Sequence, residues 1–234
     1  MDRSIGPVVH GGSTLTSVAP IQLRPDTLTG TVFETLRDYI LDATLPPGCQ
    51  VTEATLSQRL QVSKTPVREA LLRLRHMGLV EPVGRSLQVI NLSHKRIQDA
   101  YEYRAGMEAT AARLAAERAS TQTKYALVGL AEESVVSARH GRDLGFKSAD
   151  MTFHSQIAAA ADNPMLVGSV ENLLALCYVL RRRDIKHPAA TSDCAAEHID
   201  IAAAISAGDS ERASALAYDH VHHVLRLVMA AVGD

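Results

Sequence analysis

The first hundred residues constrain the fold most, because signals that start and stop helices follow one another there at short intervals. Apolar residues repeat at helical spacing over 31–41, and the Pro-Pro-Gly sequence at 46–48 ends that helix. After a short extended piece around Val51, Thr52 is placed to cap a second helix over 53–60. Short helices with fixed breaks leave few ways to fold this part of the chain.

A third helix and a hairpin complete the pattern. Ser63 is a second N-cap, and Pro66 falls in the first helical turn, where its missing N–H would have had no helical partner. Two β-favouring pieces, LVEPV and SLQVI, then flank Gly84 and Arg85. Helix, helix, turn, helix, hairpin is the order of a winged helix-turn-helix.

Basic residues concentrate in this same region. Six Lys or Arg stand against two acids between Arg59 and Arg85, whereas residues 94–234 hold 15 basic and 18 acidic residues. The net charge of −2 argues against a broad, non-specific binder of polyanions. A winged helix-turn-helix lays the N-terminal end of its third helix on base edges in the major groove, where the helix dipole also favours phosphate. The alternative is that these basic side chains only solvate a surface helix.

From Ser93 onward the sequence predicts helices throughout. Ser93 caps a long helix over 94–119, and five more are expected over 122–140, 145–161, 164–185, 191–206 and 209–232. Six helices with short connections describe an antiparallel bundle. The fold class is therefore mainly α, with three parts: a flexible N-terminal arm (1–28), a winged helix-turn-helix domain (29–91) and an all-helical domain (92–234).

Four polar residues fall at inward positions of this bundle. Asp150 and His154 share one helix face at i and i+4, His198 lies in an apolar stretch, and His220 lies in the last helix. Three imidazoles and a carboxylate suit a divalent ion, zinc first and nickel, manganese or iron(II) as alternatives. Such an ion would attract the carboxylate of a small acid. Each residue could instead be a hydrogen-bonded core residue.

Two further histidines need a separate interpretation. His222 and His223 are expected at the surface, although His223 lies one turn from His220 and could replace it as a ligand. Asn163 is expected to cap the helix that begins at Pro164.

The segment from "LPPG" to "SLQV", above all "VSKTPVREALLRL" and "GLVEP", resembles the DNA-binding domain of GntR-type bacterial transcription regulators. The resemblance covers about 60 residues and implies two groups of contacts. The operator contacts would be Ser63, Lys64, Thr65 and Arg68, and the wing tip would be Gly84 and Arg85. Many members carry an Arg where this chain has Ala54, so the operator preference of relatives does not transfer directly.

The helical part resembles the ligand-binding FCD domain of the FadR-type branch of these regulators, over about residues 94–230. The similarity rests on "D..FH..I", on "EH..I..AI..GD" and on a His 22 residues after His198. It implies the shorter, six-helix, metal-containing, VanR-like subgroup, with Asp150, His154, His198 and His220 as metal ligands. It also makes Arg104 a candidate for pairing with an effector carboxylate, the alternative being an intrahelical salt bridge with Glu108.

Together these features predict a homodimeric, ligand-responsive transcription repressor rather than an enzyme. Its expected partners are double-stranded operator DNA with a short inverted repeat and a small organic acid. Three unpatterned cysteines and the lack of a signal peptide or an apolar run of about 18 residues favour the cytoplasm and no membrane contact. Three alternatives are a regulator that senses the metal itself, one with a structural ion, and a metalloenzyme fused to a DNA-binding domain.

Overall fold

The computed structural model describes residues 26–91, 93–139, 143–180 and 188–232. The N-terminal part comprises α1 (Asp26–Leu41), β1 (Gln50–Val51), α2 (Glu53–Leu60), α3 (Lys64–His76), β2 (Val80–Val83) and β3 (Ser86–Val89). The C-terminal part comprises α4 (His94–Arg118), α5 (Thr121–Arg139), α6 (Asp143–Ala160), α7 (Pro164–Leu180), α8 (Pro188–Ala207) and α9 (Ser210–Val232).

Caps and one turn fix the winged part. The hydroxyl of Thr52 accepts the backbone N–H of Thr55 at 3.1 Å and starts α2. The strands form an antiparallel sheet in the order β1-β3-β2. Gly84, at the first position of the two-residue turn between β2 and β3, has φ of +59°, which a residue with a side chain adopts with difficulty. The wing therefore has the tight tip that the sequence predicts.

Ser63 behaves differently from the other predicted caps. It occupies the N-cap position of α3 with an extended backbone, but its side chain makes no capping hydrogen bond. Its hydroxyl is exposed at the end of the helix. The predicted N-cap position of Ser63 is thus confirmed, although its side chain does not bond to the helix.

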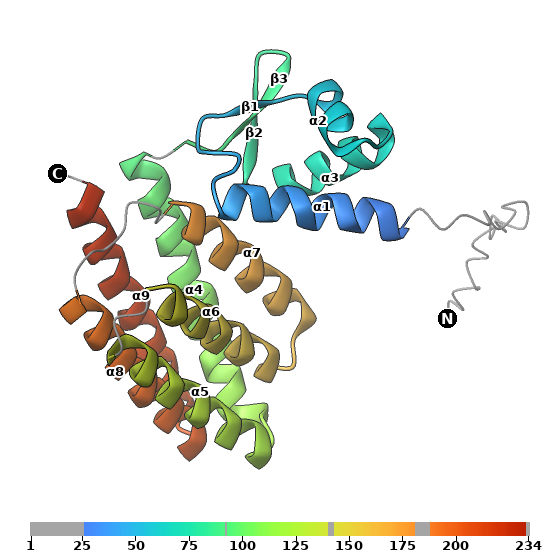
Figure 1. Cartoon of the computed structure of the whole chain (residues 1–234). Coiled ribbons are helices and arrows are strands. Elements are labelled where there is room, and N and C mark those ends of the chain that lie inside the picture. The colour runs from blue at the N-terminus through green and yellow to red at the C-terminus, as the bar shows by residue number, and fades with distance from the viewer. Residues whose placement is uncertain (1–25, 92, 140–142, 181–187, 233–234) are drawn as a thin grey trace, which may run out of the picture.

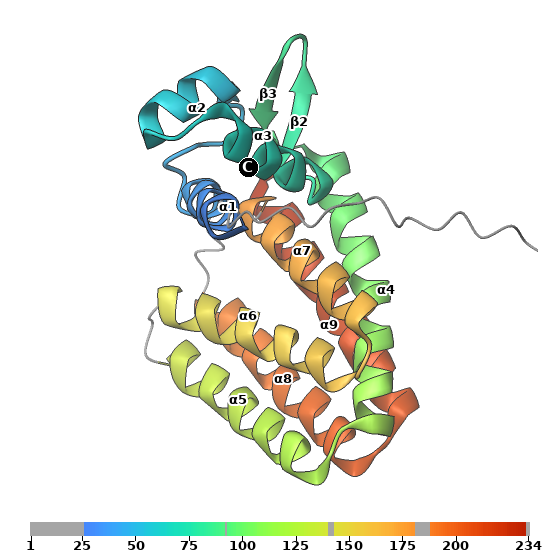
Figure 2. The same ribbon diagram turned by 90° about the vertical axis from the view of Figure 1, so that its right-hand side faces the viewer.

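The described residues of the helical part form six helices, α4 to α9. These helices run in alternating directions (Figures 1 and 2). Helix α4 packs along α9, and α5 packs against α6 and α8. The hydroxyl of Ser93 accepts the N–H of Arg96 at 3.2 Å, and the side chain of Asn163 accepts the N–H of Met165 at 3.1 Å. Both predicted caps are confirmed. Many core positions are alanines, which let the helices approach one another closely.

One apolar core joins the two parts. It runs from Leu36 and Leu74 in the winged part to Leu180 and Val228 in the helical part. A bidentate ion pair adds to it, because Arg96 near the start of α4 donates to the carboxylate of Glu81 on β2 at 2.8 and 2.6 Å. The wing is therefore attached to the helix that enters the second domain.

The predicted fold class, a winged helix-turn-helix followed by six helices, is confirmed. Most of the predicted arm (1–28) lies outside the described residues, but α1 begins at Asp26, before the predicted boundary. The start was missed because Thr29 and Gly30 are poor helix formers. None of the helices in the described ranges is both long and apolar enough to cross a membrane.

The core of the winged part provides a matched test of stability. Leu74 is fully buried and Leu72, on the same helix, is 41% exposed. We expect Leu74→Ala to lower the free energy of unfolding by about 2–5 kcal/mol and Leu72→Ala to change it by less than about 1 kcal/mol. Chemical denaturation followed by circular dichroism measures both, and equal losses would contradict the packing of α3 described above.

Candidate metal centre and DNA-binding surface

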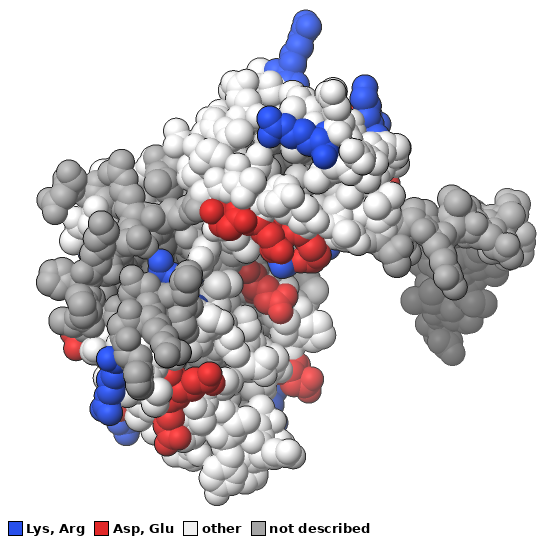
Figure 3. All heavy atoms as spheres, in the orientation of Figure 1, with Lys and Arg blue, Asp and Glu red and all other residues white. Residues whose placement is uncertain are grey.

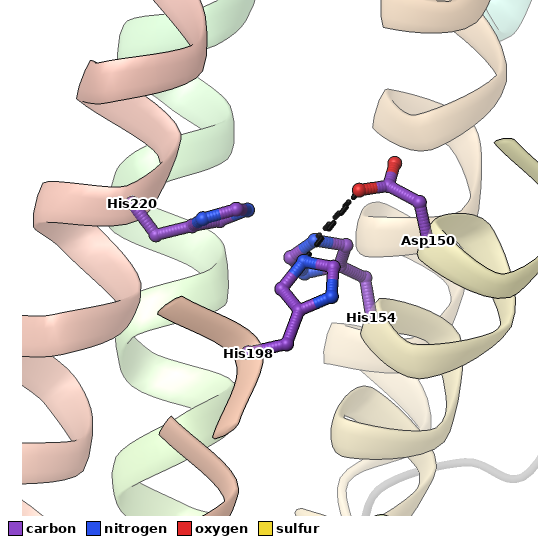
Figure 4. Close-up of side chains that lie close together, drawn as sticks. All are labelled: Asp150, His154, His198 and His220. Atoms are coloured by element: carbon purple, nitrogen blue, oxygen red, sulfur yellow. Dashed lines mark ion pairs between the residues drawn. The ribbon is translucent and has the colours of Figure 1, made fainter. Parts of the chain in front are cut away.

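The structure brings the four residues predicted as metal ligands to one place (Figure 4). Asp150 and His154 extend from α6, His198 from α8 and His220 from α9, and they point toward a common centre. One potential ligand atom from each lies within 4.8 Å of the others. All four residues are buried, at 5% exposure or less.

The imidazole nitrogens show what the centre requires. The Nε2 atoms of His154, His198 and His220 are all buried and have no hydrogen-bond partner. Those of His154 and His198 lie 3.7 and 3.6 Å from Oδ1 of Asp150, which is too far for a hydrogen bond. Each buried nitrogen without a hydrogen-bond partner destabilises the fold by about 1–3 kcal/mol. Three such nitrogens around one carboxylate are expected where a bound metal ion supplies the missing partner. The residues present therefore fit a divalent metal.

The other nitrogen of each imidazole is held by a neighbour. His154 Nδ1 lies 2.6 Å from Glu108, His198 Nδ1 lies 3.1 Å from the hydroxyl of Ser134, and His220 Nδ1 lies 2.7 Å from Glu197. Metal-binding histidines commonly donate their second N–H in this way, which orients the ring and fixes its tautomer. The partners hold each Nε2 toward the centre.

Arg104 extends this network on α4. Its Nε donates to Glu108 at 2.5 Å, so the intrahelical salt bridge considered for it is present. Arg104 is 2% exposed, and its Nη2 has no hydrogen-bond partner. One donor of the guanidinium thus remains available to an anion.

The environment keeps two imidazoles in the state that a metal requires. Burial lowers the pKa of His198 well below its usual value, and the nearby His220 and His154 lower it further. Burial also lowers the pKa of His220, against the opposing effect of its hydrogen bond to Glu197. Both rings are therefore neutral at neutral pH, as metal ligands must be.

Charged neighbours determine the remaining pKa values. Burial would raise the pKa of Glu108, but Arg104 and His154 outweigh it and lower the pKa to about 2. Burial would lower the pKa of His154, but the charge of Glu108, the hydrogen bond to Glu108 and the nearby carboxylate of Asp150 raise it. An ion that binds His154 must therefore compete with a proton.

The six residues predicted to contact DNA all lie exposed at the other end of the molecule. They are Ser63, Lys64, Thr65, Arg68, Gly84 and Arg85. Lys and Arg side chains project from this end in Figure 3, while acidic side chains lie lower on the visible face. The guanidinium of Arg68 is held by both carboxylate oxygens of Glu53, each at 2.9 Å.

Three residues around the centre were not predicted as part of it. Glu108 was considered only as a partner of Arg104, Glu197 only as part of the pattern "EH..I..AI..GD", and Ser134 was not considered. Ser134 and Glu197 reach the imidazoles from another helix, so no sequence spacing could have indicated them. His222 and His223, expected at the surface, are partly buried, and His223 Nδ1 lies 2.7 Å from Glu197.

Comparisons with known proteins agree with this architecture. The family model described as "Bacterial regulatory proteins, gntR family" matches residues 28–86, and the model of the FCD domain matches residues 99–223. The chain is 31% identical over 200 residues to a "Probable D-xylose utilization operon transcriptional repressor" of Paenarthrobacter nicotinovorans, covering 83% of this chain and 86% of that protein.

Two proteins of Escherichia coli extend the similarity. The HTH-type transcriptional repressor RspR is 26% identical over 195 residues, with 82% of this chain and 85% of the relative covered. The solved structure of McbR/YncC has a TM-score of 0.70 at 23% identity, covering 86% of this chain and 96% of that one, and it supports the fold. The chain belongs to the GntR family of bacterial DNA-binding transcription regulators and carries a C-terminal FCD domain, whose buried Asp and His residues are consistent with the metal-binding FCD subgroup.

Proposed function

We propose that this regulator is a repressor whose affinity for its operator is controlled by a small carboxylic acid bound at a divalent metal ion. The observation that carries the proposal is the convergence of three unpartnered, buried Nε2 atoms and one carboxylate inside the FCD domain. Relatives named as repressors support the direction of control. The family is one of transcription regulators, so the metalloenzyme alternative is not retained.

Asp150, His154, His198 and His220 would hold the ion. Oxygen and nitrogen ligands without sulfur suit zinc, and also nickel, manganese or iron(II). When bound, the metal would supply a positive centre for an acid's carboxylate. The free Nη2 of Arg104 would donate a hydrogen bond to the same anion, since a buried donor gains most from a charged acceptor.

Helix α4 would carry the signal to the DNA-binding end. Arg104 and Glu108 on this helix contact the centre through His154, and Arg96 on the same helix grips Glu81 next to the wing. An effector that draws Arg104 toward the metal would therefore displace the helix to which the wing is attached. A coupling of about 1–3 kcal/mol gives 5- to 150-fold regulation.

Operator binding would use a homodimer and a short inverted repeat, because a two-fold protein reads a two-fold site. The exposed end of α3, with Ser63, Lys64, Thr65 and Arg68, would enter the major groove. The wing tip at Gly84 and Arg85 would lie on the adjacent backbone.

Arg68 provides a test of the proposed contacts with DNA. We expect Arg68→Ala to weaken binding to an operator selected from random double-stranded DNA by about 5- to 150-fold, the value of one bidentate contact to a base. Fluorescence anisotropy measures the affinity, and Arg113→Ala on α4 is the control with a basic residue removed far from the wing. Unchanged affinity of Arg68→Ala would show that the assigned reading end is wrong.

His198 provides a test of the proposed metal centre. Wild-type protein purified without a chelating tag should hold one divalent ion at the centre, and His198→Ala should lose it, as measured by elemental analysis. Added metal should stabilise the wild type by about 2.7 kcal/mol at a hundredfold excess over the dissociation constant. The exposed His76 provides the same substitution as a control. Equal metal content in both variants would refute the centre.

The proposed effector can be tested on metal-loaded protein. Among small mono- and dicarboxylic acids, at least one should release the selected operator from metal-loaded protein by about 5- to 150-fold, and chelation should abolish the response. The primary amides of the same acids are the control for the carboxylate. Release by metal alone, or no response to any acid by operator release and thermal shift, would contradict the proposal.

A further inference from the structure

A second cluster of metal-ligating groups lies beside the candidate centre. Cys194 and Glu197 occupy one face of α8 at i and i+3, and His223 faces them from α9. One potential ligand atom from each lies within 4.8 Å of the others. Cys194 is 5% exposed, and the other two side chains are partly buried.

We propose that Cys194, Glu197 and His223 form a second metal site that takes a thiophilic divalent ion such as zinc. A thiolate, an imidazole and a carboxylate are all established zinc ligands, and three protein ligands leave a fourth position for water. The proposal goes beyond the regulator function and does not require that the first centre be filled.

The distances are compatible with one ion. Zinc bonds of about 2.0–2.3 Å in a tetrahedron hold ligand atoms about 3.2–3.8 Å apart. The three groups offer atoms within 4.8 Å of one another, so small side-chain rotations would bring them to these separations. Without an ion, His223 Nδ1 and Oε1 of Glu197 form a hydrogen bond at 2.7 Å, which metal binding would replace as the two groups move apart. Cys194 would bind as a thiolate, and its proton would pass to water.

Glu197 connects the second cluster to the first centre. Its Oε2 accepts a hydrogen bond from Nδ1 of His220, while Oε1 faces His223. One carboxylate thus orients a ligand of the first ion and supplies a ligand to the second. The partial exposure of Glu197 and His223, at 34% and 22% of their side chains, leaves the second site open to an incoming ion.

The two sites differ in their donor atoms. The first offers one carboxylate and three imidazoles, whereas the second contains sulfur. A thiolate favours softer ions than oxygen ligands do, so the sites are expected to rank metals differently. The thiolate also provides a spectroscopic signature that the first site lacks.

The test uses cobalt(II) as the probe with full-length, metal-free protein. We expect two equivalents to bind per chain, and a thiolate-to-cobalt charge-transfer band to accompany one of them. Cys194→Ser should abolish the band and reduce the stoichiometry from two to one. Cys49→Ser, a cysteine in the winged part, is the matched control and should keep both.

Two histidine pairs keep the test decisive if Cys194→Ser folds poorly. His223→Ala should remove the sulfur-coordinated ion, while His222→Ala at the adjacent position should leave two equivalents and the band. His154→Ala should leave one equivalent with the band, which separates failure of the first centre from failure of the second. Absence of the charge-transfer band in folded wild-type protein, or its persistence in both Cys194→Ser and His223→Ala, would overturn the proposal.

Discussion

The burial of charged and polar groups inside an apolar helical core is the constraint on which the structure of the C-terminal domain depends. Seven of the eight buried polar side chains in the described part of the chain gather in one place: Arg104, Glu108, Ser134, Asp150, His154, His198 and His220. Each such group is costly to bury without a partner. The partners come from five different helices, so satisfying them fixes how those helices pack. The three Nε2 atoms left over mark where an ion would complete the arrangement.

Helix α4 connects this core to the winged domain. Arg96 and Arg104 are eight residues apart, so the contact with the wing and the contact with the buried network lie about 12 Å apart on one helix. A helix transmits a displacement along its axis with little loss because its backbone is hydrogen-bonded throughout. Since the apolar core also continues from one part to the other, movement of α4 would be resisted by packing on both sides. The proposed control of DNA binding would therefore act through a small displacement of α4 at the buried network.

The sequence predicted the features that depend on local signals. The caps at Thr52 and Ser93, the turn at Gly84 and the i, i+4 pair on α6 each follow from residues close together in the chain, and each is present. The contributions of Ser134 and Glu197 could not be predicted, because their partners lie on other helices and depend on packing. Ser63 occupies the predicted N-cap position of α3 without a capping hydrogen bond, so the residue type indicated where the helix starts but not how its first N–H groups are satisfied.

At the helix-turn-helix end the charged side chains are exposed, in contrast to the buried network of the FCD domain. Arg68 is held by Glu53 in the free protein, and the hydrogen bond from Arg68 lowers the pKa of the Glu53 carboxyl, yet the arginine side chain is 62% exposed. An exposed ion pair is weak because water and salt screen it, so in the proposed complex DNA would replace Glu53 as the partner of Arg68 at little cost. Before DNA binds, the ion pair with Glu53 restricts the conformations of the long Arg68 side chain. Less conformational entropy would therefore be lost when Arg68 contacts DNA. This regulator thus combines a buried network that fixes its FCD domain with an exposed ion pair on the helix-turn-helix that can exchange partners easily.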